Sequence, residues 1–228
     1  RYTGLAERNL GVLFLIQGKG SDAVNHLENY LRSLDHGDRR EMSLIYNLMG
    51  NAMFIDKKSE YALTYYKNAE KLDKDFVDVL HNIGLVYARI QKYSKAIEYF
   101  QRAIDKDDKY IQAYYNLGVT YGDMGDMDKA VEFFNKVITL DGDFAGAWNN
   151  LGVIYGKKGD YSRSLYYLNK AIACRPTMAD AWNLLGLLLE TKMHQVIPAI
   201  TAYTVAHLLD PGNAKYRKML QDLVSVSL

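Results

Sequence analysis

Apolar residues recur along the chain at offsets of three and four, and the whole pattern repeats every 34 residues. Offsets of three and four place side chains on one face of a helix. A second apolar series follows each first series after a short polar turn, such as Gly125-Asp126 or Gly159-Asp160. The pattern therefore predicts a succession of helical hairpins, with a first and a second helix in each period.

A glycine lies inside the first predicted helix of each period. Such a glycine costs about 1 kcal/mol relative to alanine, so its regular return indicates a packing requirement. The in-phase residues are Gly50, Gly84, Gly118, Gly152 and Gly186. We interpret them as points where the second helix crosses closely, small residue against small residue, with large residues in the grooves on either side. The small residues on the second helices are Ala62, Ala96, Ala130 and Ser164.

The period predicts an all-α solenoid of about six helical hairpins and a C-terminal capping helix, as one domain over residues 1–228. The predicted repeats are 4–37, 43–76, 77–110, 111–144, 145–178 and 179–213, followed by the cap at 214–228. Five extra residues at 38–42 indicate a longer loop or an extended helix. One extra residue is expected near His194-Gln195, which places Pro198 in the first turn of its helix.

Three polar residues are expected to cap second helices at their N-termini, because their short side chains accept hydrogen bonds from free backbone amides. They are Ser94, Asp128 and Ser162. The cap at 214–228 is amphipathic, and it carries Gln221 where a further repeat would need glycine. We therefore expect the stacking to stop there, with a solvated outer face on the last helix.

The spacing within a period resembles the tetratricopeptide repeat. The residues that carry the resemblance are Trp148, Leu151, Gly152 and Tyr155, then Ser164, Leu168, Ala171 and Pro176. The copy that begins at Ile111 matches as well, and the resemblance covers nearly the whole chain. It implies a right-handed superhelix whose first helices line a concave surface. Proteins of this family bind other proteins through such surfaces.

The composition excludes several classes of partner. The 28 basic and 27 acidic residues give a net charge of +1, which does not favour nucleic acid or an anionic membrane surface. No apolar run reaches the roughly 18 residues that a membrane-spanning helix needs. Cys174 is the only cysteine, so no internal disulfide forms and the compartment stays open, with the cytoplasm slightly favoured.

No catalytic, cofactor or metal site is predicted. The histidines lack metal-ligand spacing, and Cys174 is interpreted as a buried packing thiol. The histidines are His26, His36, His81, His194 and His207. Aspartate clusters at 73–78, 105–108, 123–128 and 141–143 lack the spacing of a calcium-binding loop, so we interpret them as caps and turn formers.

The tyrosines could provide stacking platforms for single-stranded nucleic acid, but most of them occupy interior positions of the repeat. Core packing therefore explains Tyr66, Tyr87, Tyr121 and Tyr155 better. A second group on the second helices is expected to be partly exposed. It consists of Tyr61, Tyr65, Tyr99, Tyr166 and Tyr167.

The resemblance places one set of polar residues on the concave surface, and these are the candidate partner-binding residues. They are Asn9, Asn47, Asn51, His81, Asn82, Arg89, Tyr115, Asn116, Asn149, Asn150, Lys157 and Asn183, together with Arg8. Four of the asparagines share one repeat position, namely Asn9, Asn82, Asn116 and Asn150. Carboxamides donate to and accept from a peptide backbone, as in the similar superhelix of O-linked N-acetylglucosamine transferase. The alternative is local hydrogen bonding between helices.

These features predict a noncatalytic scaffold or adaptor that binds a partner protein segment in its groove. Chaperone-binding relatives hold a terminal carboxylate with lysine, arginine and asparagine. The matching positions here lack the cations, so binding of chaperone tails is not expected. Two alternatives stay open: the substrate-recruiting region of a larger enzyme such as a glycosyltransferase, since the chain starts at Arg1, and a self-assembling structural subunit.

Overall fold

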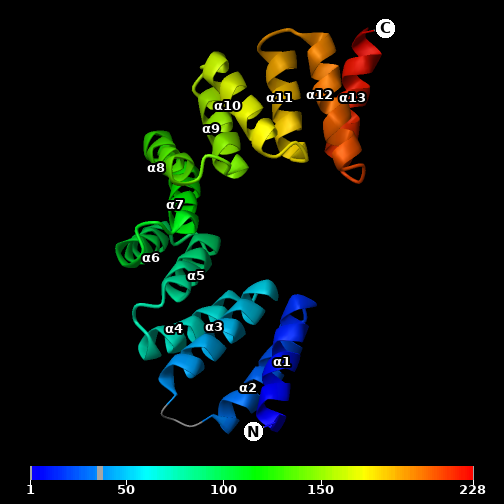
Figure 1. The fold of residues 1–228 in the computed structure, drawn as a ribbon. Helices are drawn as coiled ribbons and strands as arrows, with labels where there is room; N and C mark the ends of the chain where they lie inside the picture. Colours follow the sequence, from blue (N-terminus) through cyan, green and yellow to red (C-terminus); the bar gives the residue numbers. More distant parts are fainter. Residues whose placement is uncertain (1, 35–37, 228) are drawn as a thin grey trace. The chain divides into compact units, whose positions relative to one another are not determined.

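The computed structural model describes residues 2–34 and 38–227, which form thirteen α-helices and no strand (Figure 1). The first helices of the pairs are α1 (Tyr2–Ile16), α3 (Arg39–Ile55), α5 (Val77–Arg89), α7 (Ile111–Asp123), α9 (Ala145–Lys157) and α11 (Ala179–Thr191). The second helices are α2 (Gly20–Ser33), α4 (Ser59–Leu72), α6 (Tyr93–Lys106), α8 (Met127–Leu140), α10 (Tyr161–Cys174) and α12 (Val196–Leu209). The last helix is α13 (Ala214–Ser227). The predicted all-α helical repeat fold is confirmed.

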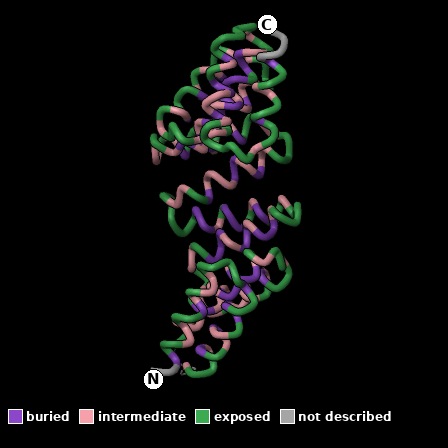
Figure 2. Tube along the Cα trace, turned by 90° about the vertical axis from the view of Figure 1, so that its right-hand side faces the viewer, coloured by how far each residue is buried: buried purple, intermediate pink, exposed green. Residues whose placement is uncertain are grey.

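The chain divides into two compact units, residues 1–120 and 121–228, and each is described by itself. In both units the helices of a pair pack together, and the second helix then packs on the next first helix: α2 on α3 and α4 on α5, then α8 on α9 and α10 on α11. The single domain over 1–228, the repeat boundaries and the handedness of a superhelix stay predictions. Within each unit the buried residues lie along these helix interfaces (Figure 2).

Four of the phase-marking glycines, Gly50, Gly84, Gly152 and Gly186, each provide space for a large side chain of the partner helix. A Cβ atom on Gly50 would overlap the ring of Tyr66, and one on Gly84 would lie 2.5 Å from the ring of Phe100. Gly186 meets Tyr203 in the same way, at 2.7 Å. The close approach is confirmed, but the expected pairing of small against small is wrong. A side chain at the glycine would displace a residue that is fully buried.

The turns inside the pairs confirm both predicted changes of period. Each contains one residue with positive φ, and these residues are Gly18, Lys57, Gln91, Gly125, Gly159 and His194. The middle four are 34 residues apart, whereas the first interval is five residues longer and the last is one longer. The turn at Gly159 closes by a bond from Asp160 N to Tyr155 O. The turn at His194 closes from Gln195 N to Leu189 O, so it holds the extra residue.

The five extra residues before the second pair lengthen a helix. α3 begins at Arg39, and the side chain of Asp38 caps it by accepting a hydrogen bond from Glu41 N at 3.1 Å. Of the two alternatives, the extended helix is therefore observed. Gly37, which ends the first predicted repeat, and His36 lie outside the described residues.

The predicted N-caps of the second helices are wrong by two residues. Ser94, Asp128 and Ser162 lie inside α6, α8 and α10. The caps of α8 and α10 are Asp126 and Asp160. Their carboxylates accept hydrogen bonds from the backbone amides of Lys129 and Arg163, each three residues later, at 3.1 and 3.0 Å. The glycine that precedes each of these aspartates takes the positive φ of the turn, so the helix begins earlier than the serine pattern indicates.

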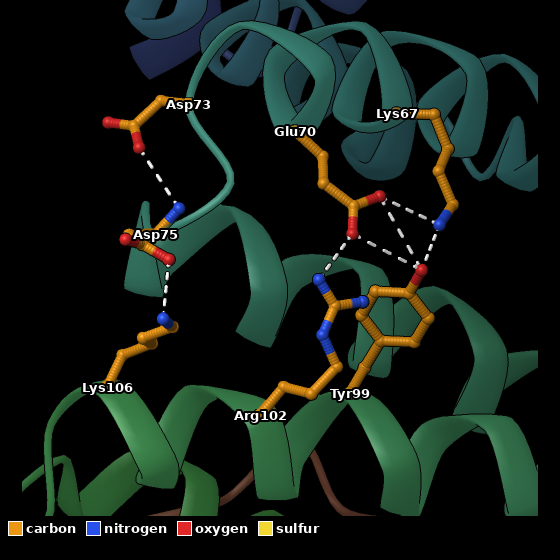
Figure 3. A network of polar contacts seen from close by, with 7 residues as sticks. All are labelled: Lys67, Glu70, Asp73, Asp75, Tyr99, Arg102 and Lys106. Atoms are coloured by element: carbon orange, nitrogen blue, oxygen red, sulfur yellow. Dashed lines mark hydrogen bonds and ion pairs between the residues drawn. The ribbon is translucent and has the colours of Figure 1, made fainter.

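Charged and aromatic side chains join the second helices α4 and α6 (Figure 3). Glu70 accepts hydrogen bonds from Lys67 Nζ at 2.8 Å and from Arg102 Nη2 at 2.7 Å. Burial raises the pKa of Glu70, but these hydrogen bonds outweigh it and hold the pKa below its usual range. The guanidinium of Arg102 lies 4.6 Å from the ring centroid of Tyr99, whose hydroxyl also contacts Lys67. Tyr99 is buried, so its expected partial exposure is wrong.

The terminal helices differ in polarity. α13 packs on α12, burying Tyr216 and Leu223, and Gln221 is exposed. The side chain of Val226 lies outside the described ones. α1 instead exposes Leu10 by 39% and Leu13 by 47%, although the equivalent residues of later first helices are at most 6% exposed. Among the described residues, no preceding helix pair covers this side of α1.

The difference between α1 and the later first helices gives a matched pair of substitutions at one repeat position. Leu151→Ala should destabilise the protein by roughly 2–5 kcal/mol, because it opens a cavity in a packed interface. Leu10→Ala should cost about 1 kcal/mol or less, because much of this side chain already contacts water. Urea unfolding followed by circular dichroism measures both. Equal losses of stability would contradict the different packing of the two leucines.

Candidate functional site

An asparagine cluster joins the first helices α3 and α5 in the first unit. Asn82 Nδ2 on α5 donates hydrogen bonds to Asn47 Oδ1 at 3.0 Å and to Asn51 Oδ1 at 3.2 Å. The Asn51 oxygen also accepts from the hydroxyl of Tyr66 at 2.7 Å. Asn47 is buried, whereas Asn51 and Asn82 keep part of their surface exposed. The cluster therefore fixes two carboxamides at the surface of these helices.

The next pair of first helices uses a histidine in the same way. Asn116 Nδ2 on α7 lies 2.8 Å from Nε2 of His81 on α5 and also donates to Gln112 O at 2.9 Å. The His81 ring lies among aromatic residues, with ring centroids 5.7 Å from Phe100 and 5.3 Å from Tyr110. Burial lowers the pKa of His81 to about 4, against the opposing effect of the nearby Asp78 carboxylate. The imidazole is therefore neutral at pH 7, and Nε2 accepts the hydrogen bond.

Both contacts follow one spacing rule. The residue three before a glycine pairs with the residue two before the next glycine, 35 positions along the chain. Hydrogen bonding between adjacent helices is therefore confirmed for Asn82 and Asn116. A ligand role for the asparagine row stays a prediction.

Buried asparagines in the second unit lack the partner that this rule provides. Asn149 is 8% exposed and Asn183 is 3% exposed, and Oδ1 of each accepts no hydrogen bond from the described residues. The spacing places Leu184 opposite Asn149, where the first unit has an asparagine. An unpaired buried carbonyl of this kind costs roughly 1–3 kcal/mol.

The other candidate residues differ in exposure. Asn9, Arg89 and Lys157 are exposed, and Arg8, Tyr115 and Asn150 are half-buried. Arg89 Nη1 donates to the carbonyl oxygen of Phe54 at 2.7 Å, and its guanidinium carbon lies 3.3 Å from the centroid of the Phe54 ring. Arg89 and Phe54 thus fill the space between the C-terminal ends of α3 and α5.

A hollow of about 260 Å³ opens between α9, α10 and α11. Of its lining residues, only Lys157 belongs to the partner-binding residues predicted from the sequence. Its walls are mostly apolar and include Val153, Leu168, Leu184 and Leu187. Two sequence signals indicate it. Leu184 interrupts the asparagine row, and a glycine at 156 occupies the repeat position of Phe54.

The aspartate clusters and the cysteine have structural contacts. Asp73, Asp107 and Asp141 each accept a hydrogen bond at 3.0 Å from the backbone amide two residues later, which confirms their interpretation as turn formers. Cys174 is half-buried rather than buried, and burial raises its pKa, so the thiol stays protonated. In the described part of the chain, no three His, Cys, Asp or Glu residues gather as metal ligands do.

Models of the tetratricopeptide repeat match residues 77–142 and 145–178. No curated protein sequence matches the chain. Within residues 2–34 and 38–227, no helix has the length and apolarity to span a bilayer.

Solved structures with the same fold cover most of the chain. A structure of MamA is 26% identical with a TM-score of 0.62, covering 77% of this chain and 96% of its own. PilF of Pseudomonas aeruginosa is 18% identical with a TM-score of 0.77, covering 97% and 98%. YrrB, described as a TPR protein with an unusual peptide-binding site, is 19% identical with a TM-score of 0.59, covering 80% and 93%.

The buried histidine predicts a loss of stability in mild acid. The folded-state pKa of His81, about 4, lies below its ordinary value of 6.5, so unfolding takes up a proton between these pH values. This contribution is complete above pH 6.5 and declines as the pH falls towards 4. The urea midpoint of His81→Asn should fall less over this range than that of the wild type. His194→Asn, which replaces an exposed histidine, is the control, and a slope unchanged by His81→Asn would contradict the assignment.

Proposed function

Because this chain belongs to the tetratricopeptide repeat family, we propose that it is a noncatalytic scaffold whose first helices bind an extended segment of a partner protein. The proposal concerns the surface that the first helices form within each unit, with the candidate residues of that unit. The near-neutral net charge makes a polypeptide a better partner than a nucleic acid. No step of the proposal needs a cofactor or a metal.

The carrying observation is the hydrogen-bonded asparagine cluster of α3 and α5. Asn51 uses its oxygen for both of its bonds, so its amide nitrogen is the group that would donate to a ligand carbonyl. The cluster holds this carboxamide in one orientation, which lowers the entropy lost when a ligand binds. A main-chain carbonyl of an extended segment fits such a donor without demanding a particular side chain.

The exposed members of the candidate set provide a further contact. Asn9 and Arg89 lie on the first helices α1 and α5 and are open to solvent. Arg89 holds its guanidinium over the ring of Phe54, so it presents fixed donors to carbonyl or carboxylate oxygens. The peptide-binding site for which the similar protein YrrB is described favours a polypeptide ligand here as well.

The proposal is tested by purifying the native protein with its bound proteins and then titrating the identified partner. Asn9→Ala combined with Arg89→Ala should weaken that partner about tenfold or more, because exposed polar anchors on a binding face are lost. Both side chains are solvent-exposed, so the fold should be retained. Asn135→Ala combined with Asn169→Ala is the matched control, since both asparagines are exposed on second helices.

Equal affinity of the double variant and the wild type, with unchanged unfolding midpoints, would reject the first-helix surface as the binding face. A larger loss in the Asn135 and Asn169 control would instead assign the partner to the second helices.

A further inference from the structure

The hollow between α9, α10 and α11 lies against two first helices of the second unit. It holds about 260 Å³. A cavity of about 150 Å³ with aliphatic and aromatic walls accommodates benzene, whereas pockets for whole drug-sized ligands begin at about 300 Å³. The hollow therefore has the size of one large apolar side chain.

Three replacements explain why this space is open. Between α3 and α5, Phe54 and Arg89 stack on each other and fill the equivalent surface. Between α9 and α11 the corresponding residues are Gly156 and Thr191, which leave that volume empty. The third replacement is Leu184, which stands at the position of Asn82 and supplies an apolar wall.

The apolar wall is present at the expense of a hydrogen bond. Asn149 is buried next to this region on α9, and its Oδ1 accepts no bond from the described residues. An asparagine at position 184 would provide the missing donor by the spacing rule seen for Asn82 and Asn116. Leucine at position 184 leaves Oδ1 of Asn149 without this donor and makes the wall of the hollow apolar. An apolar wall gained at the loss of a hydrogen bond is expected of a binding pocket rather than of a stabilising contact.

Two exposed cations lie among the lining residues. Lys157 ends α9, and Lys192 follows the last residue of α11. The nearby carboxylate of Glu190 on α11 accepts a hydrogen bond from the hydroxyl of Tyr203 at 2.7 Å. Glu190 is not one of the lining residues, whereas both lysines are, so the charge of the lining is positive and complements an acidic ligand.

We propose that this hollow binds one bulky aliphatic or aromatic side chain of a partner segment whose neighbouring residues are acidic. The apolar side chain enters between Leu184, Leu187 and Val153, and the carboxylates contact Lys157 and Lys192. This inference rests on the proposed function, because it assumes that the ligand is a polypeptide. It adds the anchor residue and the charge of that segment.

The test uses short peptides with blocked ends, Ser-Glu-Ser-X-Ser-Glu-Ser, titrated into the isotope-labelled full chain and followed by NMR. With X as phenylalanine or leucine, the shifts should saturate and should concentrate at Val153, Leu184 and Leu187. With X as alanine, binding should weaken about tenfold or more, because the buried apolar area is lost. Replacing both glutamates by lysine should weaken it as well.

Leu184→Asn is the decisive variant. It should weaken the phenylalanine peptide about tenfold or more, while the unfolding midpoint is kept because Asn149 gains a partner. Leu48→Asn is the matched control, since Leu48 has the same repeat position on α3 and does not line the hollow. Lys157→Glu combined with Lys192→Glu should remove the preference for glutamate and leave the fold intact, because both lysines are exposed.

Several outcomes would overturn the inference. Equal binding of the alanine and phenylalanine peptides, shifts located elsewhere, or equal effects of Leu184→Asn and Leu48→Asn would each do so. Hexanoate that binds as tightly as the phenylalanine peptide would assign the hollow to small molecules. In all these cases the partner titration with Asn9 and Arg89 variants could still succeed, so the anchor site and the proposed function fail separately.

Discussion

The packing of a large second-helix side chain onto a first-helix glycine is the contact on which both units depend. Gly50 and Tyr66, Gly84 and Phe100, and Gly186 and Tyr203 repeat this contact with little variation. Because the glycine has no Cβ, the large residue is fully buried against the backbone of the partner helix. This contact thereby fixes the distance between the two helices. The fixed distance in turn positions the residues on the other side of the first helix.

The sequence predicts the helices well because their determinants are local and periodic. The glycine series, the apolar offsets and both changes of period agree with the helices and turns that are observed. The N-caps at Ser94, Asp128 and Ser162 were wrong, because a cap depends on where the preceding turn closes, and serine is common on either side of that point. The residue facing each glycine was also wrong, since periodicity indicates a face but not which partner occupies it.

The candidate site was less predictable because it depends on pairs of residues in adjacent helices. The asparagine row was visible in the sequence, but its hydrogen bonds to Asn47 and His81 follow a 35-residue offset that no single repeat contains. The apolar hollow follows from residues that are missing, namely the large side chains at 156 and 191. A search for repeated patterns finds residues that recur, whereas the hollow lies where the residues differ from those of the other repeats.

The turn at His194 has a consequence for how such a chain can change in length. The hydrogen bond from Gln195 N to Leu189 O closes this turn and spans one residue more than the equivalent bond at Gly159. The ring of Tyr203 still packs on Gly186. The residue added to the turn has thus left the helix contact on either side intact. We therefore expect a longer loop to be accepted at this turn, whereas a residue inserted within a helix would rotate every side chain beyond it away from its glycine.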